Sequence, residues 1–335
     1  MAITMLPDSR LLPEVLPTQR LNARGMAVMP MRADLRRIAN VRNVLTIVSV
    51  WSQTLGLILA TQWAVSQTRW WPLWIPVFVL MGRGHGLFGI LGHESAHRLL
   101  FSSQKLNDLA GVWLVNAPAF VSQGAYRRSH MAHHRNALGP DEPDKSLYAG
   151  YPITKASFIR KMRRDASGKS GLKIFRGLLR GLRNPIARMS VVKILSVQIV
   201  LIVVLSFTVG WWAWPVLWFA PWMTVWRVIN RLRAIAEHGG MTASSDERIV
   251  THHCRQGLMA RFWMVPFHTG WHIAHHLDAG VTWRNLPRFH DELEAAGYFP
   301  DGLVHQNYVA LWRRLTSRPE TVAETALSSA VAPVA

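Results

Sequence analysis

The sequence predicts an all-α integral membrane protein, with four transmembrane helices in two hairpins and a helical cap outside the membrane that holds a two-metal site. Three observations support this fold class. Four segments are apolar over roughly the 20 residues that cross a bilayer. Only 17% of the 335 residues are charged, whereas soluble domains carry about 25%. The chain is also rich in tryptophan, with 16 of them.

The four apolar segments run near residues 44–65, 71–91, 191–209 and 211–228. Short turns join the members of each pair, so we expect two hairpins. Tryptophans gather at the turn of each hairpin, as in the aromatic belt at a membrane interface: Trp70, Trp71 and Trp74 in the first, and Trp211, Trp212 and Trp214 in the second. A fifth apolar stretch, 106–121, is short for a span, and we expect it to be interfacial or re-entrant.

The positive charge of the chain is concentrated between the hairpins. The net charge is +19, and within residues 151–193 the only acid among many basic residues is Asp165. By the positive-inside rule, both termini and this region are cytoplasmic. We therefore expect a bacterial inner-membrane location, with a cytoplasmic active site and contacts to anionic lipids. Membrane topology explains this positive charge better than binding to nucleic acid does. We therefore expect no nucleic-acid partner.

The expected organisation follows from these segments. Residues 1–43 form a cytoplasmic N-terminal segment, 44–316 a membrane domain, and 317–335 a disordered tail. Within the membrane domain, the cytoplasmic cap comes from 92–190 and 230–316. We expect no cleaved signal peptide, because the first 40 residues lack an apolar core. The single cysteine, Cys254, cannot form an internal disulfide.

Histidines carry the strongest functional signal. Eight of the 15 fall into a pair spaced i, i+4 and two HxxHH clusters, and a ninth follows the fourth apolar segment. A lone helical histidine is more often a packed or solvated residue, but side chains at i, i+3 and i+4 share a helix face, and neutral imidazole is the commonest metal ligand. All nine are expected at the cytoplasmic side: His93, His97, His130, His133, His134, His238, His272, His275 and His276.

Nine imidazoles exceed the ligands of one ion and favour a dinuclear centre. Imidazole suits iron, copper, zinc or nickel, and oxygen chemistry on an apolar substrate favours iron. Carboxylates near the clusters are candidates to orient the imidazoles, although each also suits a helix cap or a surface charge: Glu94, Asp141, Asp144, Glu237 and Asp278. Within the second apolar segment, His85 is a candidate tunnel residue. We expect the remaining histidines at 252, 253, 290 and 305 to be solvated.

These motifs resemble those of the membrane fatty acid desaturase and hydroxylase superfamily. His93 to His97 resembles its HxxxH box, the two HxxHH clusters match its other boxes, and Trp283 to Pro287 resembles the pattern that trails the last box. Glu237-His238-Gly239 is similar to its extra ligand segment. The resemblance covers about residues 44–294. Two departures from the family pattern are Ala234, where some relatives have asparagine, and Ala274 in the last box.

The resemblance implies that the nine histidines hold two non-haem iron ions in a four-helix fold with a cytoplasmic cap. It implies an enzyme that uses O₂ to desaturate a fatty acyl chain or similar lipid. Electrons would come from an external donor of the ferredoxin or cytochrome type, because the sequence contains no flavin, haem or cysteine-cluster motif. Hydroxylation of a lipid or other apolar substrate by the same superfamily is the near alternative.

Two other classes remain as distant alternatives. The residues His93-Glu94-Ser95-Ala96-His97 also spell the HExxH motif of zinc metalloproteases. An intramembrane protease would need only two histidines and one carboxylate, which leaves the other histidines unexplained. A metal-binding receptor or transporter would not need all nine at one membrane face. Metal content distinguishes these classes.

Overall fold

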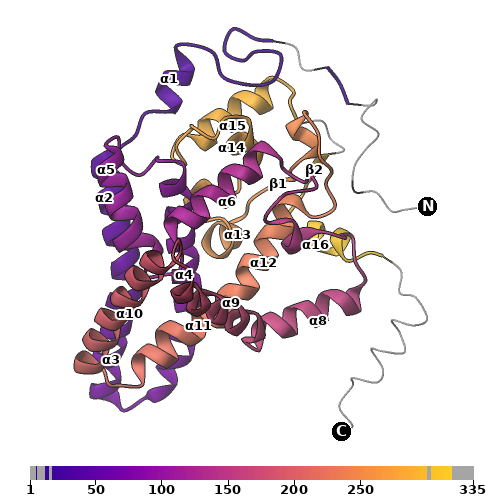
Figure 1. Cartoon of the computed structure of the whole chain (residues 1–335). Coiled ribbons are helices and arrows are strands. Elements are labelled where there is room, and N and C mark those ends of the chain that lie inside the picture. The colour runs from indigo at the N-terminus through magenta and orange to yellow at the C-terminus, as the bar shows by residue number, and fades with distance from the viewer. Residues whose placement is uncertain (1–4, 6–11, 15–16, 300–302, 319–335) are drawn as a thin grey trace.

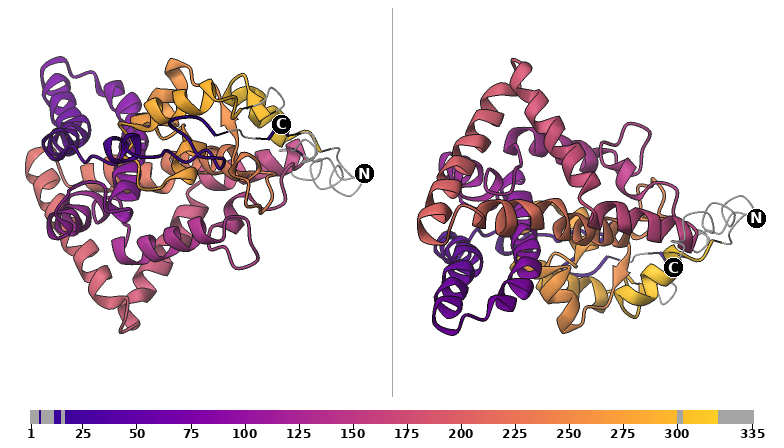
Figure 2. Two further views of the ribbon diagram at one scale, coloured as in Figure 1. Left: turned by 90° about the horizontal axis from the view of Figure 1, so that it is seen from above. Right: turned by 90° about the horizontal axis from the view of Figure 1, so that it is seen from below.

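The computed structural model describes residues 5, 12–14, 17–299 and 303–318. It is mainly helical, with the long apolar helices at one end and a group of shorter helices, called the cap below, at the other (Figure 1). The views from above and below place the indigo N-terminal helices and the yellow C-terminal helix α16 at opposite ends (Figure 2). The proposed tail begins at 317, and all of it after residue 318 lies outside the described residues.

Among the described residues, three stretches of helix are long and apolar enough to cross a membrane. The first, Met31–Thr68, combines α1 (Met31–Leu35), α2 (Asn40–Trp51), a π-helical turn (Ser52–Gly56) and α3 (Leu57–Thr68). The second joins a 3-10 turn (Trp71–Leu73) to α4 (Trp74–Ala96), and the third is α10 (Arg188–Thr208). More of α4 is buried than of the other two. The histidine pair at its end is therefore carried by the central helix.

The fourth expected span is not confirmed as one long apolar helix. A π-helical turn (Trp214–Phe219) leads into the short helix α11 (Ala220–Met223), and the backbone leaves the helical region at Thr224. Proline lacks the N–H that continues a helix, and Pro215 and Pro221 lie within this stretch. The following helix, α12 (Val225–His238), is amphipathic and carries arginines. It leads the chain from the apolar end into the cap.

Close packing joins α4 to α12. A Cβ on Gly82 would lie 2.3 Å from Cγ1 of Val225, and one on Gly86 would lie 3.0 Å from the Trp226 ring. The glycines therefore allow the two helices to approach each other. Deeper in the bundle, Trp218 stacks on Trp51 with ring centroids 6.0 Å apart. Trp51 lies on α2 and Trp218 in the segment 214–219, so this contact joins two further apolar elements of the bundle.

The first part of the cap follows α4. It contains α5 (Gln104–Ala110), a π-helical turn (Gly111–Asn116), α6 (Gln123–Arg135), α7 (Lys145–Tyr148), α8 (Lys155–Ala166) and α9 (Lys169–Arg180), which a 3-10 turn (Gly181–Arg183) follows. The expected interfacial stretch, 106–121, is broken into short helical pieces and exposes Leu106 and Leu109. Helix α9 exposes Leu172 and Ile174 among basic side chains.

The second part of the cap follows α12. It contains a 3-10 turn (Glu247–Ile249), α13 (Leu258–Trp263), a 3-10 turn (Pro266–His268), α14 (His272–Leu277), α15 (Leu286–Ala295) and α16 (Tyr308–Leu315). Strands β1 (His253–Cys254) and β2 (Val304–His305) pair in parallel. Helix α1 is fastened to the end of α14, because Arg32 and Arg36 both bind the carboxylate of Asp278.

Candidate metal centre

Eight of the nine singled-out histidines form two groups of four. Group A contains His93, His97, His130 and His275, and group B contains His133, His238, His272 and His276. Within each group, the four ring nitrogens lie within 4.8 Å of one another. All eight side chains are buried or nearly so. Each group has the donors to hold one metal ion.

The distances between donors match those around a single ion. In group A, Nε2 of His93 lies 3.0 Å from Nε2 of His275, and Nε2 of His130 lies 2.9 Å from Nε2 of His97. In group B, the corresponding distances are 3.0 Å for His272–His238 and 3.3 Å for His133–His276. With metal–nitrogen bonds of about 2.1 Å, adjacent donors around an octahedral ion lie about 3.0 Å apart.

The ninth histidine lies beside group A. Nε2 of His134 is 3.0 Å from Nε2 of His275 and 3.2 Å from Nε2 of His130. Its ring centroid is also 4.7 Å from that of His276, which belongs to group B. His134 therefore contacts both groups, and it offers group A a fifth nitrogen.

Four elements distant in the sequence bring these rings together: the end of α4, α6, the end of α12, and α14. Helix α6 begins at its cap residue Ser122, whose hydroxyl accepts a hydrogen bond from the Ala125 amide. Such a cap fixes where the helix begins. The i, i+3, i+4 spacing in α6 and α14 then gives each helix histidines for both groups.

The chain matches the fatty acid desaturase family over residues 68–309. The chain belongs to the fatty acid desaturase family. Membership makes it an oxidoreductase of the desaturase or oxygenase type, and the apolar helices agree with an integral membrane protein. The HxxxH and HxxHH motifs lie inside the matched range. They supply the two histidine groups.

Individual desaturases also resemble the chain. It is 24% identical to dihydrorhizobitoxine desaturase of Bradyrhizobium elkanii over 244 residues, which is 68% of this chain and 69% of the relative. It is 38% identical over 88 residues to an sn-1 acyl-lipid omega-3 desaturase (ferredoxin) of Nostoc sp. (strain 36), covering 26% of this chain and 23% of that protein. A Delta(5) fatty acid desaturase, fat-4, of Caenorhabditis elegans is 36% identical over 70 residues, 20% of this chain and 16% of the relative.

Hydrogen bonds at Nδ1 orient two rings of group B. Nδ1 of His133 lies 2.5 Å from Oε1 of the buried Glu142, and Nδ1 of His238 lies 3.0 Å from the Val250 carbonyl oxygen. A carbonyl oxygen only accepts, so the proton of His238 is on Nδ1. Its Nε2 lone pair then faces the group, which is the tautomer that a metal ligand requires.

Two other carboxylates approach group B at longer range. Oε1 of Glu237 lies 3.8 Å from Nδ1 of His272, and Oε2 of Glu247 lies 3.6 Å from Nδ1 of His276. Burial, together with the neighbouring Asp246, raises the pKa of Glu247 to about 7. These two acids are near enough to orient the rings after small movements or through water.

Two of these acids were absent from the sequence-based candidates. Glu142 lies between the candidates Asp141 and Asp144, in a loop that has no helical periodicity to indicate which side chain turns inward. Glu247 lies in the loop after α12, and nothing in its sequence spacing indicates its approach to His276.

The five acids proposed from the sequence have different locations. Glu237 lies near His272, as described. Asp144 is half-buried and lines a pocket beside both groups. Asp141 is exposed. Its neighbour Glu142 has the role that we expected for Asp141, because Glu142 bonds to the His133 ring. Glu94 is buried, and its carboxylate accepts a hydrogen bond from the backbone of Trp283. The Asp278 carboxylate binds Arg32 and Arg36 of the N-terminal segment and no imidazole of the two groups.

The remaining histidines lie outside the two groups. Nε2 of His85 is 2.9 Å from the Trp218 carbonyl oxygen, deep among the apolar helices. His268 is exposed. The expectation of solvated side chains is wrong for His252, His253 and His290, which are buried, whereas His305 is partly exposed. His290 lies flat against Trp271, at 4.1 Å between centroids, and this stack supports the residue that precedes His272.

Burial favours the neutral form of five of the imidazoles outside the apolar helices. Burial, together with His133, lowers the pKa of His97 to about 4. The pKa values of His238, His272, His275 and His276 are lowered well below the usual range, chiefly by burial. An imidazole binds a metal through its neutral form. These five rings are therefore already in the protonation state of a ligand.

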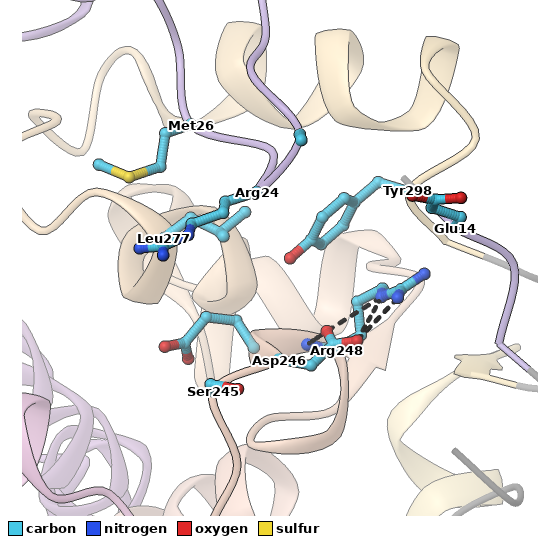
Figure 3. A pocket seen from close by; sticks show the side chains of 10 residues that line it. Glu14, Arg24, Met26, Ser245, Asp246, Arg248, Leu277 and Tyr298 are labelled. Carbon is cyan, nitrogen blue, oxygen red and sulfur yellow. Dashed lines mark hydrogen bonds and ion pairs between the residues drawn. The ribbon is translucent and has the colours of Figure 1, made fainter. Parts of the chain in front are cut away.

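One cavity lies at the centre and a second lies near it. One, of about 230 Å³, is lined by histidines of both groups and by Asp144, Arg233 and Glu237. The other, of about 530 Å³, lies beside Glu247 (Figure 3). Figure 3 shows the Tyr298 hydroxyl pointing into this second cavity, and Arg248 bonded to Asp246 at its wall. Glu247 thus lies between the second cavity and His276.

Proposed function

We propose that the chain is an integral-membrane di-iron oxygenase that desaturates a fatty acyl chain or similar lipid. It would use O₂ and electrons from an external donor of the ferredoxin or cytochrome type. The observation that carries this proposal is the convergence of nine histidines into two adjoining donor groups within a desaturase-family chain. One of its relatives is named as a ferredoxin-dependent acyl-lipid desaturase, which supports both the lipid substrate and the donor.

The donor set fits two iron ions. Every donor is an imidazole nitrogen, and the set of nine leaves room for open positions on two ions that prefer about six ligands each. Adjacent donors are 2.9–3.3 Å apart. His93, His97, His130, His134 and His275 would hold one ion, and His133, His238, His272 and His276 the other. When bound, the pair would supply the O₂ activation that no side chain provides.

The overall reaction balances with an external donor. The substrate loses two hydrogens from adjacent carbons as the double bond forms. Two electrons and two protons from outside, together with those two hydrogens, reduce O₂ to two water molecules. The chain contributes by fixing the imidazoles, through Glu142 and the Val250 carbonyl oxygen, and by burying the centre away from bulk water.

The four-span topology and its orientation belong to the same proposal. The three long apolar helices and the interrupted 211–228 segment would form the membrane part, with the histidine groups on the cytoplasmic side. The basic residues of α8 and α9 support this orientation, because positive charge favours the cytoplasmic side. Exposed apolar and basic side chains together suit α9 to a membrane surface. A bacterial inner membrane is the proposed location.

Hydroxylation of a lipid by the same centre is the alternative product. The protease alternative needs only His93, His97 and one carboxylate, and it leaves the other singled-out histidines unexplained. His93 and His97 instead lie in a group with His130 and His275.

The test is the metal content of the detergent-purified chain, with His275→Ala beside it. We expect about two iron ions per chain, and a loss of iron in the variant. The exposed His268 provides a matched control, because His268→Ala should keep both ions. One zinc ion per chain that is insensitive to His275→Ala would refute the proposal. Mass spectrometry of host lipids then separates loss of two hydrogens from gain of oxygen.

A further inference from the structure

The cavity of about 230 Å³ between α6, α7 and α12 adjoins both histidine groups. His93 and His130 of group A line it, as do His133, His238 and His272 of group B. A substrate carbon that enters this cavity therefore comes within reach of either group. Its volume is below the roughly 300–1,000 Å³ of pockets that enclose a drug-sized ligand. It has room for one end of a substrate.

The walls of this cavity are polar. Beyond the histidines, the lining includes two tyrosines, an asparagine and the charged residues Asp144, Arg233 and Glu237, while Leu147 and Ala234 are its aliphatic members. Pockets for apolar chains are lined mainly by hydrophobic and aromatic side chains. The methylene groups in the middle of an acyl chain would find little favourable contact here.

Two of the charged groups have donors or acceptors to spare. Nε of Arg233 donates to Oε1 of Glu237 at 2.7 Å, and the structure records no hydrogen bond to a described residue from its two terminal amino groups. The half-buried carboxylate of Asp144 likewise accepts no hydrogen bond from the described part of the chain. Water screens ion pairs in a partly buried site less than ion pairs on an open surface. A ligand of complementary charge would form ion pairs with both groups that the described residues do not supply.

The geometry points to a substrate with a zwitterionic head, whose carboxylate binds Arg233 and whose ammonium binds Asp144. The cavity wall has two carboxylates, of Asp144 and Glu237, and one guanidinium, of Arg233. This excess of negative charge favours an ammonium group on the ligand over a second anionic group. It follows that the oxidised bond lies close to the charged head and not in the middle of the chain. This inference rests on the proposed function, because it assumes that oxidation occurs at the two histidine groups.

The experiment compares probes that share one tail: 2-aminododecanoic acid, dodecanoic acid, dodecylamine and methyl dodecanoate. Binding to the full-length, iron-loaded protein in detergent is measured by the shift in its unfolding temperature. Turnover is measured with ferredoxin, its reductase and NADPH, and mass spectrometry locates the new bond. We expect 2-aminododecanoic acid to bind tightest and to be oxidised at carbons next to its head.

Variants of the two charged residues test the pairing. Arg233→Gln and Asp144→Asn should each weaken binding of 2-aminododecanoic acid about 10- to 100-fold, as expected for hydrogen bonds to charged groups. They should leave methyl dodecanoate binding unchanged. Arg233→Lys keeps the charge and should recover part of the affinity, provided that iron content shows the variant is folded. The exposed residues Arg313 and Asp34 supply controls, Arg313→Gln and Asp34→Asn.

The outcomes separate this inference from the proposed function. Tightest binding of methyl dodecanoate, or its oxidation in mid-chain, would overturn the inference and keep the function. Equal loss of turnover for all four probes with unchanged binding would also overturn it, because the two residues would then act on the centre itself. If the protein takes up no iron but still binds 2-aminododecanoic acid through Arg233, the function is overturned and only the head-group binding part of the inference remains.

Discussion

Nδ1 of His133 lies 2.5 Å from Oε1 of Glu142, and both side chains are buried. The other oxygen of Glu142 accepts a hydrogen bond from the backbone N–H of Leu138 at 2.5 Å. One carboxylate therefore fixes both a ring of group B and the loop that follows α6. Carboxylates bound to metal-ligating histidines set the orientation and basicity of the ring.

We expect Glu142→Gln to weaken metal binding or lower activity about 10- to 100-fold, the range found for such orienting groups. Iron content at limiting free iron measures the effect. The exposed neighbour Asp141 provides the control, because Asp141→Asn removes a nearby charge without touching His133. Unchanged iron content and activity in Glu142→Gln would show that His133 needs no carboxylate.

A second prediction concerns His134, which lies beside group A. Its Nε2 is 3.0 Å from that of His275, so His134→Ala removes a fifth nitrogen from this group. We expect turnover to be lost and the ion of group A to be bound more weakly, while group B keeps its ion. Metal analysis and an activity assay measure this, with the exposed Arg135→Ala as the control. Full turnover in His134→Ala would mean that eight histidines suffice.

The histidine groups were predictable because helical spacing determines which side chains share a face. Residues at i, i+3 and i+4 in α6 and α14 needed no tertiary information. Glu142 was not predictable in this way, because the loop after α6 has no periodicity to distinguish it from Asp141. The stack of His290 on Trp271 joins two separate segments of the cap. Burial of that histidine therefore depends on contacts that only the folded chain shows.

The membrane part was predictable to a similar extent. Apolar length identified α4 and α10, which the structure forms as long helices. The segment 211–228 has the same composition, but its prolines and the turn at Thr224 divide it. Window-averaged hydropathy does not register a break in backbone geometry. The number of spans is therefore less secure from the sequence than the position of the histidines.

A third prediction concerns the attachment of α1 to the last histidine box. The Asp278 side chain is 1% exposed and binds Arg32 at 2.9 Å and Arg36 at 2.5 Å. Asp278→Asn removes the charge and leaves both arginines without their partner. Because the arginines are partly exposed, we expect a loss of about 1–3 kcal/mol in the free energy of unfolding. Thermal unfolding in detergent measures it.

The control for this pairing is Asp34→Asn, since Asp34 is exposed on α1 itself. It changes the charge of the same segment without touching Asp278, and we expect no measurable change in stability. Equal unfolding temperatures for Asp278→Asn and the unaltered chain would show that the N-terminal segment is held by its apolar contacts alone.

The last prediction tests the approach of α12 to α4, on which the position of His238 relative to His93 depends. A methyl group at Gly82 would lie 2.3 Å from Cγ1 of Val225 and 3.3 Å from the Trp226 backbone nitrogen. Gly82→Ala should therefore separate the helices, at a cost of about 1–3 kcal/mol for overpacking, and lower iron occupancy. Gly177 in the exposed helix α9 has no atom within 4 Å of such a methyl group. Gly177→Ala should keep both stability and iron content, and an equal loss in both variants would show that helix packing at Gly82 does not control the metal centre.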